Sequence, residues 1–320
     1  MEDLKKLLKT PNIVGVPYGL QLRGSPFVDL SVQKKWEIPK KIIIKAAVTG
    51  ALFSKTENPN HPCTPEEIKA AIAESIEAGA SSVHIHLRDK SGLPTGDIKL
   101  YHEMINPLKE KYGEDLLIDG CALFGATFEE VMRPVTEGLF EVCPVNTTAV
   151  YIGDTLFSMP PQTMRAAVKI MQSLKCKPQI AVYTAGDITN AKRYLIDTGI
   201  LEKPYYWIIV PNLPGCFPMP DPLAMAEGLS FLVRRIIEID AASVIMVCAS
   251  GRAANYLSTL AMLMGLHVRV GMEDTIYRHP HEDELLKSNR EAVESAIRIA
   301  AELGREVATA HDYRKIVGIG

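Results

Sequence analysis

Short apolar runs alternate with longer amphipathic stretches along most of the chain. The first run, KIIIKAAVTG at residues 41–50, is nearly all apolar and β-branched and ends at a glycine, which indicates a strand buried on both faces. The stretch at residues 64–80 opens with Thr64, Pro65 and Glu67. This is a capping box with proline at the first helical position, so the stretch predicts a helix.

The strand-then-helix unit recurs until the chain holds eight pairs. The predicted strands are residues 41–50, 81–88, 114–122, 139–148, 177–186, 205–212, 243–251 and 266–275. The predicted helices are residues 64–80, 98–112, 127–138, 159–175, 188–199, 222–240, 252–265 and 283–304. Eight such pairs predict an α/β protein with the (β/α)8 TIM barrel fold.

An open doubly wound sheet is the alternative fold, but no GxGxxG turn follows the first strand and the chain has no Walker loop. Residues 1–40 contain several prolines and glycines and show little periodicity. We therefore expect an N-terminal extension at residues 1–40 and a barrel catalytic domain at residues 41–320.

Composition and charge exclude several classes of protein. The net charge of −3 argues against a nucleic-acid binder, because phosphate recognition needs clustered Lys and Arg; a small-molecule ligand fits better. The six cysteines include no CxxC pair, which indicates reduced thiols in a cytoplasmic protein. The N-terminus lacks the apolar segment of a signal peptide, and no apolar run approaches the roughly 18 residues of a membrane span.

Two histidines stand one residue apart in the second predicted strand, SSVHIHLR. His84 and His86 project to the same face of that strand, about 7 Å apart along it. Two readings stay open on this spacing alone: core histidines, or two ligands of a metal. In a barrel, the carboxyl ends of the strands hold the active site, and a Glu from another strand would complete a His₂Glu set suited to a catalytic zinc ion.

Other polar residues near the strand ends have structural alternatives. Arg269 could pair with a carboxylate inside the barrel, and Glu273 and Asp274 could form a polar loop. The segment HPHEDE at residues 279–284 resembles a metal site, but we expect it to head a helix, where acidic residues favour the helix dipole. We interpret Cys121 and Cys143 as buried thiols, since no base is paired with them.

Six segments of this sequence together resemble the β-keto acid cleavage enzyme family, whose founding type is 3-keto-5-aminohexanoate cleavage enzyme. They are AAVTGA (46–51), TPEEI (64–68), EAGASSVHIHLRDKSGLPTGD (77–97), ASGR (249–252), GLHVRVGMEDTIY (265–277) and AAELGREVATAHDYRKIVG (300–318). The resemblance covers roughly residues 42–319 in order. The HxHxRD and HVRxGxED blocks are its most specific parts.

The resemblance implies a (β/α)8 barrel that holds a divalent metal, usually Zn²⁺, on His84, His86 and Glu273. It implies an exchange in which a β-keto acid and acetyl-CoA, the co-substrate, give acetoacetate and a new CoA ester. The catalytic aspartate of the family corresponds to Asp274 and its partner arginine to Arg269. Members are typically tetramers, so we expect a homo-oligomer.

This sequence departs from the family pattern at four places. The STGG turn after the third strand reads IDGCA at residues 118–122, so Asp119 or Gly120 stands near the catalytic serine and Asp119 becomes a candidate acid or base. Of the Thr-x-Asn motif of the fourth strand only Asn146 matches. The acidic residue of strand five falls near Ala181. Leu52 replaces the acid that recognises the amino group of the founding substrate, which favours an apolar or neutral tail.

Three functions are therefore weighed. The first is a zinc-dependent β-keto acid cleavage enzyme that uses acetyl-CoA. The second keeps the metal and the barrel but acts as an aldolase or isomerase without CoA, with Asp119 as acid or base. The third is a non-catalytic barrel that binds a metabolite, which the loss of two catalytic hydroxyl positions would favour.

Overall fold

The computed structural model describes residues 2–10, 35–213 and 216–320. The chain divides into two units, Met1–Ile38 and Pro39–Gly320. Helix α1 (Glu2–Leu7) lies in the first unit, where the sequence pattern predicted no helix. Most of the predicted extension, residues 1 and 11–34, lies outside the described residues, so a domain boundary at residue 40 stays a prediction.

The second unit is built on a closed barrel of eight parallel strands. Around the barrel the strands follow the order β10-β11-β2-β3-β4-β5-β8-β9, which confirms the predicted (β/α)8 fold. Their bounds are β2 (Ile44–Thr49), β3 (Ser82–Ile85), β4 (Ile118–Gly120), β5 (Val142–Asn146), β8 (Lys177–Val182), β9 (Tyr206–Ile209), β10 (Val244–Val247) and β11 (His267–Val270).

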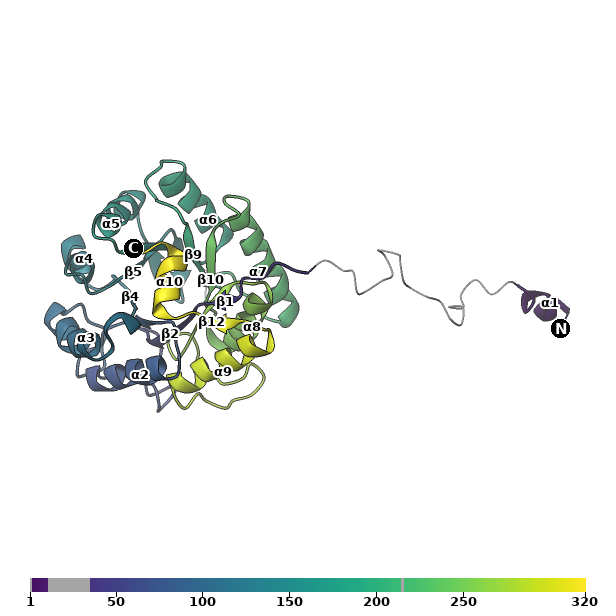
Figure 1. The fold of residues 1–320 in the computed structure, drawn as a ribbon, viewed down its shortest axis with the longest axis horizontal. Coiled ribbons are helices and arrows are strands. Elements are labelled where there is room, and N and C mark those ends of the chain that lie inside the picture. Colours follow the sequence, from purple (N-terminus) through teal and green to yellow (C-terminus); the bar gives the residue numbers. More distant parts are fainter. Residues whose placement is uncertain (1, 11–34, 214–215) are drawn as a thin grey trace. The chain divides into compact units, whose positions relative to one another are not determined.

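Helices α2 to α9 surround the barrel in sequence order, and α10 lies across the middle of the barrel in this view (Figure 1). Their bounds are α2 (Pro65–Glu77), α3 (Ile98–Tyr112), α4 (Phe128–Thr136), α5 (Pro161–Ser173), α6 (Ala185–Ala191), α7 (Pro222–Ile237), α8 (Ala254–Leu263), α9 (Asn289–Glu302) and α10 (Ala310–Val317). The two-residue strands β1 (Lys41–Ile42) and β12 (Glu306–Val307) pair parallel to each other as a separate two-stranded sheet.

Local capping explains where two of the helices begin. The predicted capping box of α2 is confirmed: Thr64 accepts from the Glu67 backbone N–H, and the Glu67 side chain accepts from the Thr64 backbone N–H. Helix α9 begins later than predicted. Its N-cap is Ser288, whose Oγ accepts from the Glu291 backbone N–H at 3.2 Å. The prediction that residues 279–284 head a helix is therefore wrong, and they lie in the loop before it.

A β-hairpin that the sequence analysis did not predict follows β5. Strands β6 (Ala149–Ile152) and β7 (Thr155–Ser158) pair antiparallel. Exposed and half-buried residues alternate along β6, and in β7 only Phe157 is half-buried, in contrast to the mostly buried barrel strands. The half-buried side chains pack against the barrel interior. The Phe157 and Tyr183 rings are in edge-to-face contact, with their centroids 5.9 Å apart.

The core has two layers, as expected for this fold. One fills the space between the strands and the surrounding helices. The other fills the barrel interior, and α10 contributes Tyr313 to it. The Tyr313 and Tyr206 hydroxyls lie 2.7 Å apart, both fully buried. The interior also contains buried charged side chains, and these belong to the site described next.

Candidate metal centre and active site

The two histidines of the second predicted strand face Glu273 at one end of the barrel. His84 lies in β3 and His86 directly after it, and their side chains are 1% and 8% exposed. Glu273 follows β11. Its carboxylate oxygens lie 3.5 Å from His84 Nε2 and 3.4 Å from His86 Nε2. The structure thus brings together the three predicted metal ligands.

These separations suit a tetrahedral metal ion. Zinc binds imidazole nitrogen and carboxylate oxygen at about 2.0–2.2 Å, so neighbouring tetrahedral ligand atoms stand about 3.3–3.6 Å apart. The two measured distances fall in this range. Glu273 Oε2 is also buried, and no described residue donates a hydrogen bond to it, although buried polar atoms normally have a partner. The residues present therefore fit a divalent ion.

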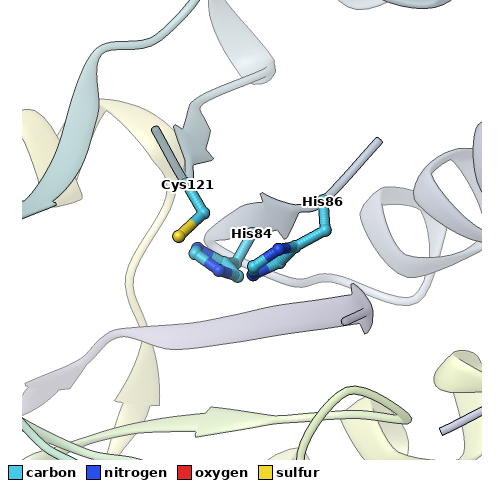
Figure 2. Close-up of side chains that lie close together, drawn as sticks. All are labelled: His84, His86 and Cys121. Carbon is cyan, nitrogen blue, oxygen red and sulfur yellow. The ribbon is translucent and has the colours of Figure 1, made fainter. Parts of the chain in front are cut away.

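Cys121 is a second possible third ligand. Its Sγ and one ring nitrogen from each histidine lie within 4.8 Å of one another, and Figure 2 shows the sulfur beside the His84 ring, with the His86 ring on the other side of His84. Burial raises the pKa of the Cys121 thiol well above its usual value, but a bound ion would itself displace that proton, so Cys121 stays a candidate ligand. The Glu273 carboxylate oxygens lie 3.5 Å and 3.4 Å from the two Nε2 atoms, so Glu273 is also placed to complete the site.

Glycine backbone brings Glu273 into place. The Glu273 backbone N–H donates to the Ala47 carbonyl at 3.1 Å. Gly271 has φ +137°, and a Cβ there would collide with the same carbonyl. At Gly50, a Cβ would lie 2.5 Å from Glu273 Cγ. Both positions need glycine because the two strand ends approach closely.

Arg269 and Asp274 form a buried two-pronged ion pair beside Glu273. Arg269 Nε donates to Asp274 Oδ2 at 3.0 Å, Nη2 donates to Oδ1, and Nη2 lies 3.1 Å from Glu273 Oε1. Burial, reinforced by the Glu273 charge and opposed by Arg269, raises the pKa of Asp274 to about 6. Burial alone would raise the pKa of Glu273 too, but Arg269 and the two histidines hold it well below its usual value. The two adjacent carboxyls thus have different proton affinities, as in many acid–base sites.

Asp119 lies beneath the histidines rather than beside the expected substrate. Its side chain is fully buried, with Oδ2 3.2 Å from His84 Nδ1 and in an ion pair with Lys45 Nζ. Burial opposes its ionisation, but Lys45 and His84 lower the pKa of Asp119 below its usual value. Lys45 was missed by the sequence analysis. The available signal was a lysine in the middle of the apolar run of residues 41–50, flanked by Ile44 and Ala46.

A cavity of about 470 Å³ opens over this cluster. His84, His86, Arg269, Glu273 and Asp274 form part of its wall. Asn146 lines it too, and its Oδ1 accepts from the Tyr183 hydroxyl at 2.9 Å. Most of the remaining wall is apolar: Ala51, Leu52, Leu123, Phe124, Pro144, Ile152, Phe157, Ala181, Ile208, Val210 and Leu213.

The sequence pattern of the β-keto acid cleavage enzymes matches residues 41–319. The chain belongs to the β-keto acid cleavage enzyme family. The match spans the whole barrel and every side chain of the cluster. As a family member, the protein is an enzyme.

Curated relatives support this membership. The chain is 35% identical to the 3-keto-5-aminohexanoate cleavage enzyme of Fusobacterium nucleatum, over 88% of this chain and 98% of that protein. It is 32% identical to the enzyme of the same name from Acetoanaerobium sticklandii, over 88% and 99%. A 3-dehydrocarnitine:acetyl-CoA trimethylamine transferase of Rhizobium meliloti is 25% identical, over 86% and 96%.

Solved structures agree on the fold. The apo structure of ObcA superposes with a TM-score of 0.71 at 18% identity, covering 82% of this chain and 66% of ObcA. At this identity the likeness concerns the barrel alone.

Other residues singled out from the sequence lie outside this cluster. In the segment at residues 279–284, His279, Glu282 and Glu284 come within 4.8 Å of one another, but the two acids are exposed to solvent. Cys143 is buried, and burial raises the pKa of its thiol. No helix in the described part of the chain is long and apolar enough to cross a membrane.

Proposed function

We propose that this family member transfers the acyl group of a β-keto acid to CoA. The β-keto acid R–CO–CH₂–COO⁻ and acetyl-CoA would give R–CO–S-CoA and acetoacetate. The bond between the keto carbon and the methylene carbon breaks, and that methylene carbon bonds to the acetyl carbonyl. The thioester moves from acetyl to R–CO, so atoms and charge balance without a further reactant.

The residues of the cluster would have different roles in this reaction. His84, His86 and Glu273 would hold the divalent ion, which we propose is zinc. Such an ion supplies Lewis-acid polarisation of carbonyl oxygens. The Arg269 guanidinium holds the Asp274 carboxylate by two hydrogen bonds, so Asp274 is fixed in the cavity wall as a proton acceptor. Asn146, whose oxygen is occupied by Tyr183, would donate its amide hydrogens to the substrate.

The observation that carries the proposal is a single cavity lined by charged side chains on one side and apolar side chains on the other. One side presents the charged cluster that suits a β-keto carboxylate, and the other side is apolar. Names of the relatives add support: one acts on 3-keto-5-aminohexanoate, and another is an acetyl-CoA-dependent transferase. An acid or base role for Asp119 in contact with substrate gains no support, because its side chain is fully buried under His84.

The substrate tail would be uncharged and apolar. Among the described residues lining the cavity, the charged side chains all belong to the cluster: Arg269, Glu273 and Asp274, together with its two histidines. A tail ammonium or carboxylate would therefore meet Leu52, Phe124 or Phe157 without a counter-charge. Burying an unpaired charge is costly, whereas an alkyl tail gains from the same contacts.

Incubation with acetyl-CoA and matched β-keto acids tests this function. The acids share one chain length and end in a methyl, an ammonium or a carboxylate group, and mass spectrometry detects new CoA esters. We expect the methyl-ended acid to exceed both charged ones in kcat/KM by about 100-fold or more, which is a barrier difference of about 3 kcal/mol.

Three results would each contradict part of the proposal. Zinc binding with no turnover of any keto acid favours the metabolite-binding barrel. Turnover that does not require CoA favours an aldolase or isomerase. Equal use of the charged acids leaves the reaction in place but refutes the apolar tail.

A cytoplasmic location and a homotetramer are also part of the proposal. Two helices that contact each other, α7 and α8, carry five exposed apolar side chains, and these support contact between copies of the chain. They are Leu223, Phe231 and Ile237 on α7 and Tyr256 and Leu263 on α8.

A further inference from the structure

Lys45 is a lysine with no exposed surface, inside the barrel. Its ammonium forms an ion pair with Asp119 and donates to Gln179 Oε1 at 3.0 Å. It also lies over the rings of Tyr206 and Tyr313, 5.6 and 5.8 Å from their centroids. Each of these contacts compensates part of the cost of burying a charge.

Strand register places this lysine directly beneath a metal ligand. On adjacent strands Ala47 pairs with His84, and His84 pairs with Asp119. Lys45 stands two residues before Ala47, so it points to the same barrel interior one layer lower. Asp119 Oδ2 therefore reaches both the Lys45 ammonium and His84 Nδ1, which lies 3.2 Å away.

We propose that Lys45 and Asp119 are positioning residues for the metal ligand His84. Lys45 balances the buried charge of Asp119. Asp119 Oδ2, 3.2 Å from His84 Nδ1, would serve as the acceptor for that buried nitrogen, which has no hydrogen-bond partner among the described residues. The ring is then fixed with its Nε2 lone pair directed at the ion, on the side where Glu273 lies. The inference rests on the proposed metal site, and it gives Asp119 a role through His84 instead of on the substrate.

Stability alone does not account for this pair. Replacing a buried ion pair by apolar side chains of similar volume is often neutral or stabilising. A histidine ligand, by contrast, gains orientation and basicity when its second nitrogen donates to a carboxylate. The position of the pair, against the far nitrogen of His84, fits this second purpose.

Two double variants separate positioning from packing. In K45M/D119N the pair is neutral, and the introduced amide keeps an oxygen that accepts from His84 Nδ1–H. In K45M/D119L the pair is equally neutral and that acceptor is lost. The zinc dissociation constant is measured by competition with a chromophoric chelator. Urea unfolding of the metal-free proteins shows that each variant is folded.

We expect K45M/D119L to bind zinc about 10- to 100-fold more weakly than the unchanged protein, the usual effect of removing such a partner. K45M/D119N should bind zinc more tightly than K45M/D119L. Lys177→Met serves as the matched control, because Lys177 is 8% exposed at the start of β8 and forms none of these contacts. Its zinc affinity should be unchanged.

The inference is overturned if folded K45M/D119L binds zinc as tightly as the unchanged protein, or no more weakly than K45M/D119N. His84→Ala separates this failure from failure of the metal site. If His84→Ala still binds zinc normally, the proposed site itself is wrong. If His84→Ala loses zinc and K45M/D119L keeps it, only the positioning role fails.

Discussion

His84 and His267 are both buried histidines of barrel strands, and their neighbours give them opposite properties. His84 lies between the carboxylates of Glu273 and Asp119, which raise its pKa although burial opposes this. In the part of the chain that the structure describes, no carboxylate pairs with His267, and its Nδ1 accepts the Ile43 backbone N–H at 3.0 Å. Burial, together with the nearby Arg305 charge, lowers the pKa of His267 to about 3. His267 is thus a neutral structural residue.

This difference predicts acid sensitivity of the fold. The unfolded chain takes up a proton on His267 near the usual pKa of 6.5, whereas the folded chain resists it. The stability contributed by neutral His267 is therefore present above pH 6.5 and is lost as the pH falls toward 3. Single-site linkage gives a loss of about 2 kcal/mol between pH 7 and pH 5.

Urea unfolding at the two pH values measures this loss. His267→Asn keeps an oxygen for the Ile43 N–H and does not titrate, so it is the matched control. We expect the unchanged protein to lose about 2 kcal/mol more than His267→Asn. Equal losses in the two proteins would contradict the assignment.

The sequence pattern revealed the two histidines, His84 and His86, but not the Lys45–Asp119 pair that lies against His84. The HxH spacing marks two side chains on one strand face, and that is local information. Lys45 and Asp119 lie 74 positions apart, and only the register of β2, β3 and β4 places them together. A buried polar network of this kind cannot be read from spacing along the chain.

Among the elements, the loop after β11 determines where the third ligand lies. Asn289, the first residue of α9, accepts from the Met272 N–H at 2.8 Å and donates to the Val48 carbonyl at 2.9 Å. These bonds join the loop to the end of β2. Gly271 allows this close approach, because its φ of +137° and its contact with the Ala47 carbonyl exclude a side chain.

Gly271→Ala should therefore destabilise the protein and weaken zinc binding. The backbone conformation alone costs about 1–3 kcal/mol, and the clash with Ala47 adds to it and displaces Glu273. Gly304→Ala is the control, because Gly304 has φ +72° but nothing near its missing side chain. Urea unfolding and zinc titration check both variants. A Gly271→Ala protein that holds zinc as tightly as Gly304→Ala would refute the role of this glycine.

Element prediction succeeded where capping and periodicity agreed, as in α2. It failed where one residue outweighed the pattern, since Ser288 starts α9 after the predicted beginning. The β6–β7 hairpin was missed because the predicted strand at residues 139–148 runs directly into it and its own half-buried alternation is short. That hairpin contributes Ile152, Thr155 and Phe157 to the cavity wall.

For the whole molecule, closure of the barrel converts distant segments into one site. Glu273 and Arg269 from the last strand region meet His84 and His86 because β11 pairs with β2 and β2 with β3. Eight alternating units and the family motifs were enough to predict this arrangement. For the apolar side of the cavity, the sequence offered only Leu52, because the other apolar lining residues come from separate loops and strands.

The most direct test of the account follows carbon from acetyl-CoA into the products. The enzyme is incubated with a methyl-ended β-keto acid and acetyl-CoA that carries carbon-13 in both acetyl carbons. The proposed reaction gives acetoacetate labelled in its methyl and keto carbons, with an unlabelled methylene and carboxylate, and an equal amount of unlabelled acyl-CoA. Acetoacetate without label, or loss of the keto acid with no new CoA ester, would contradict it.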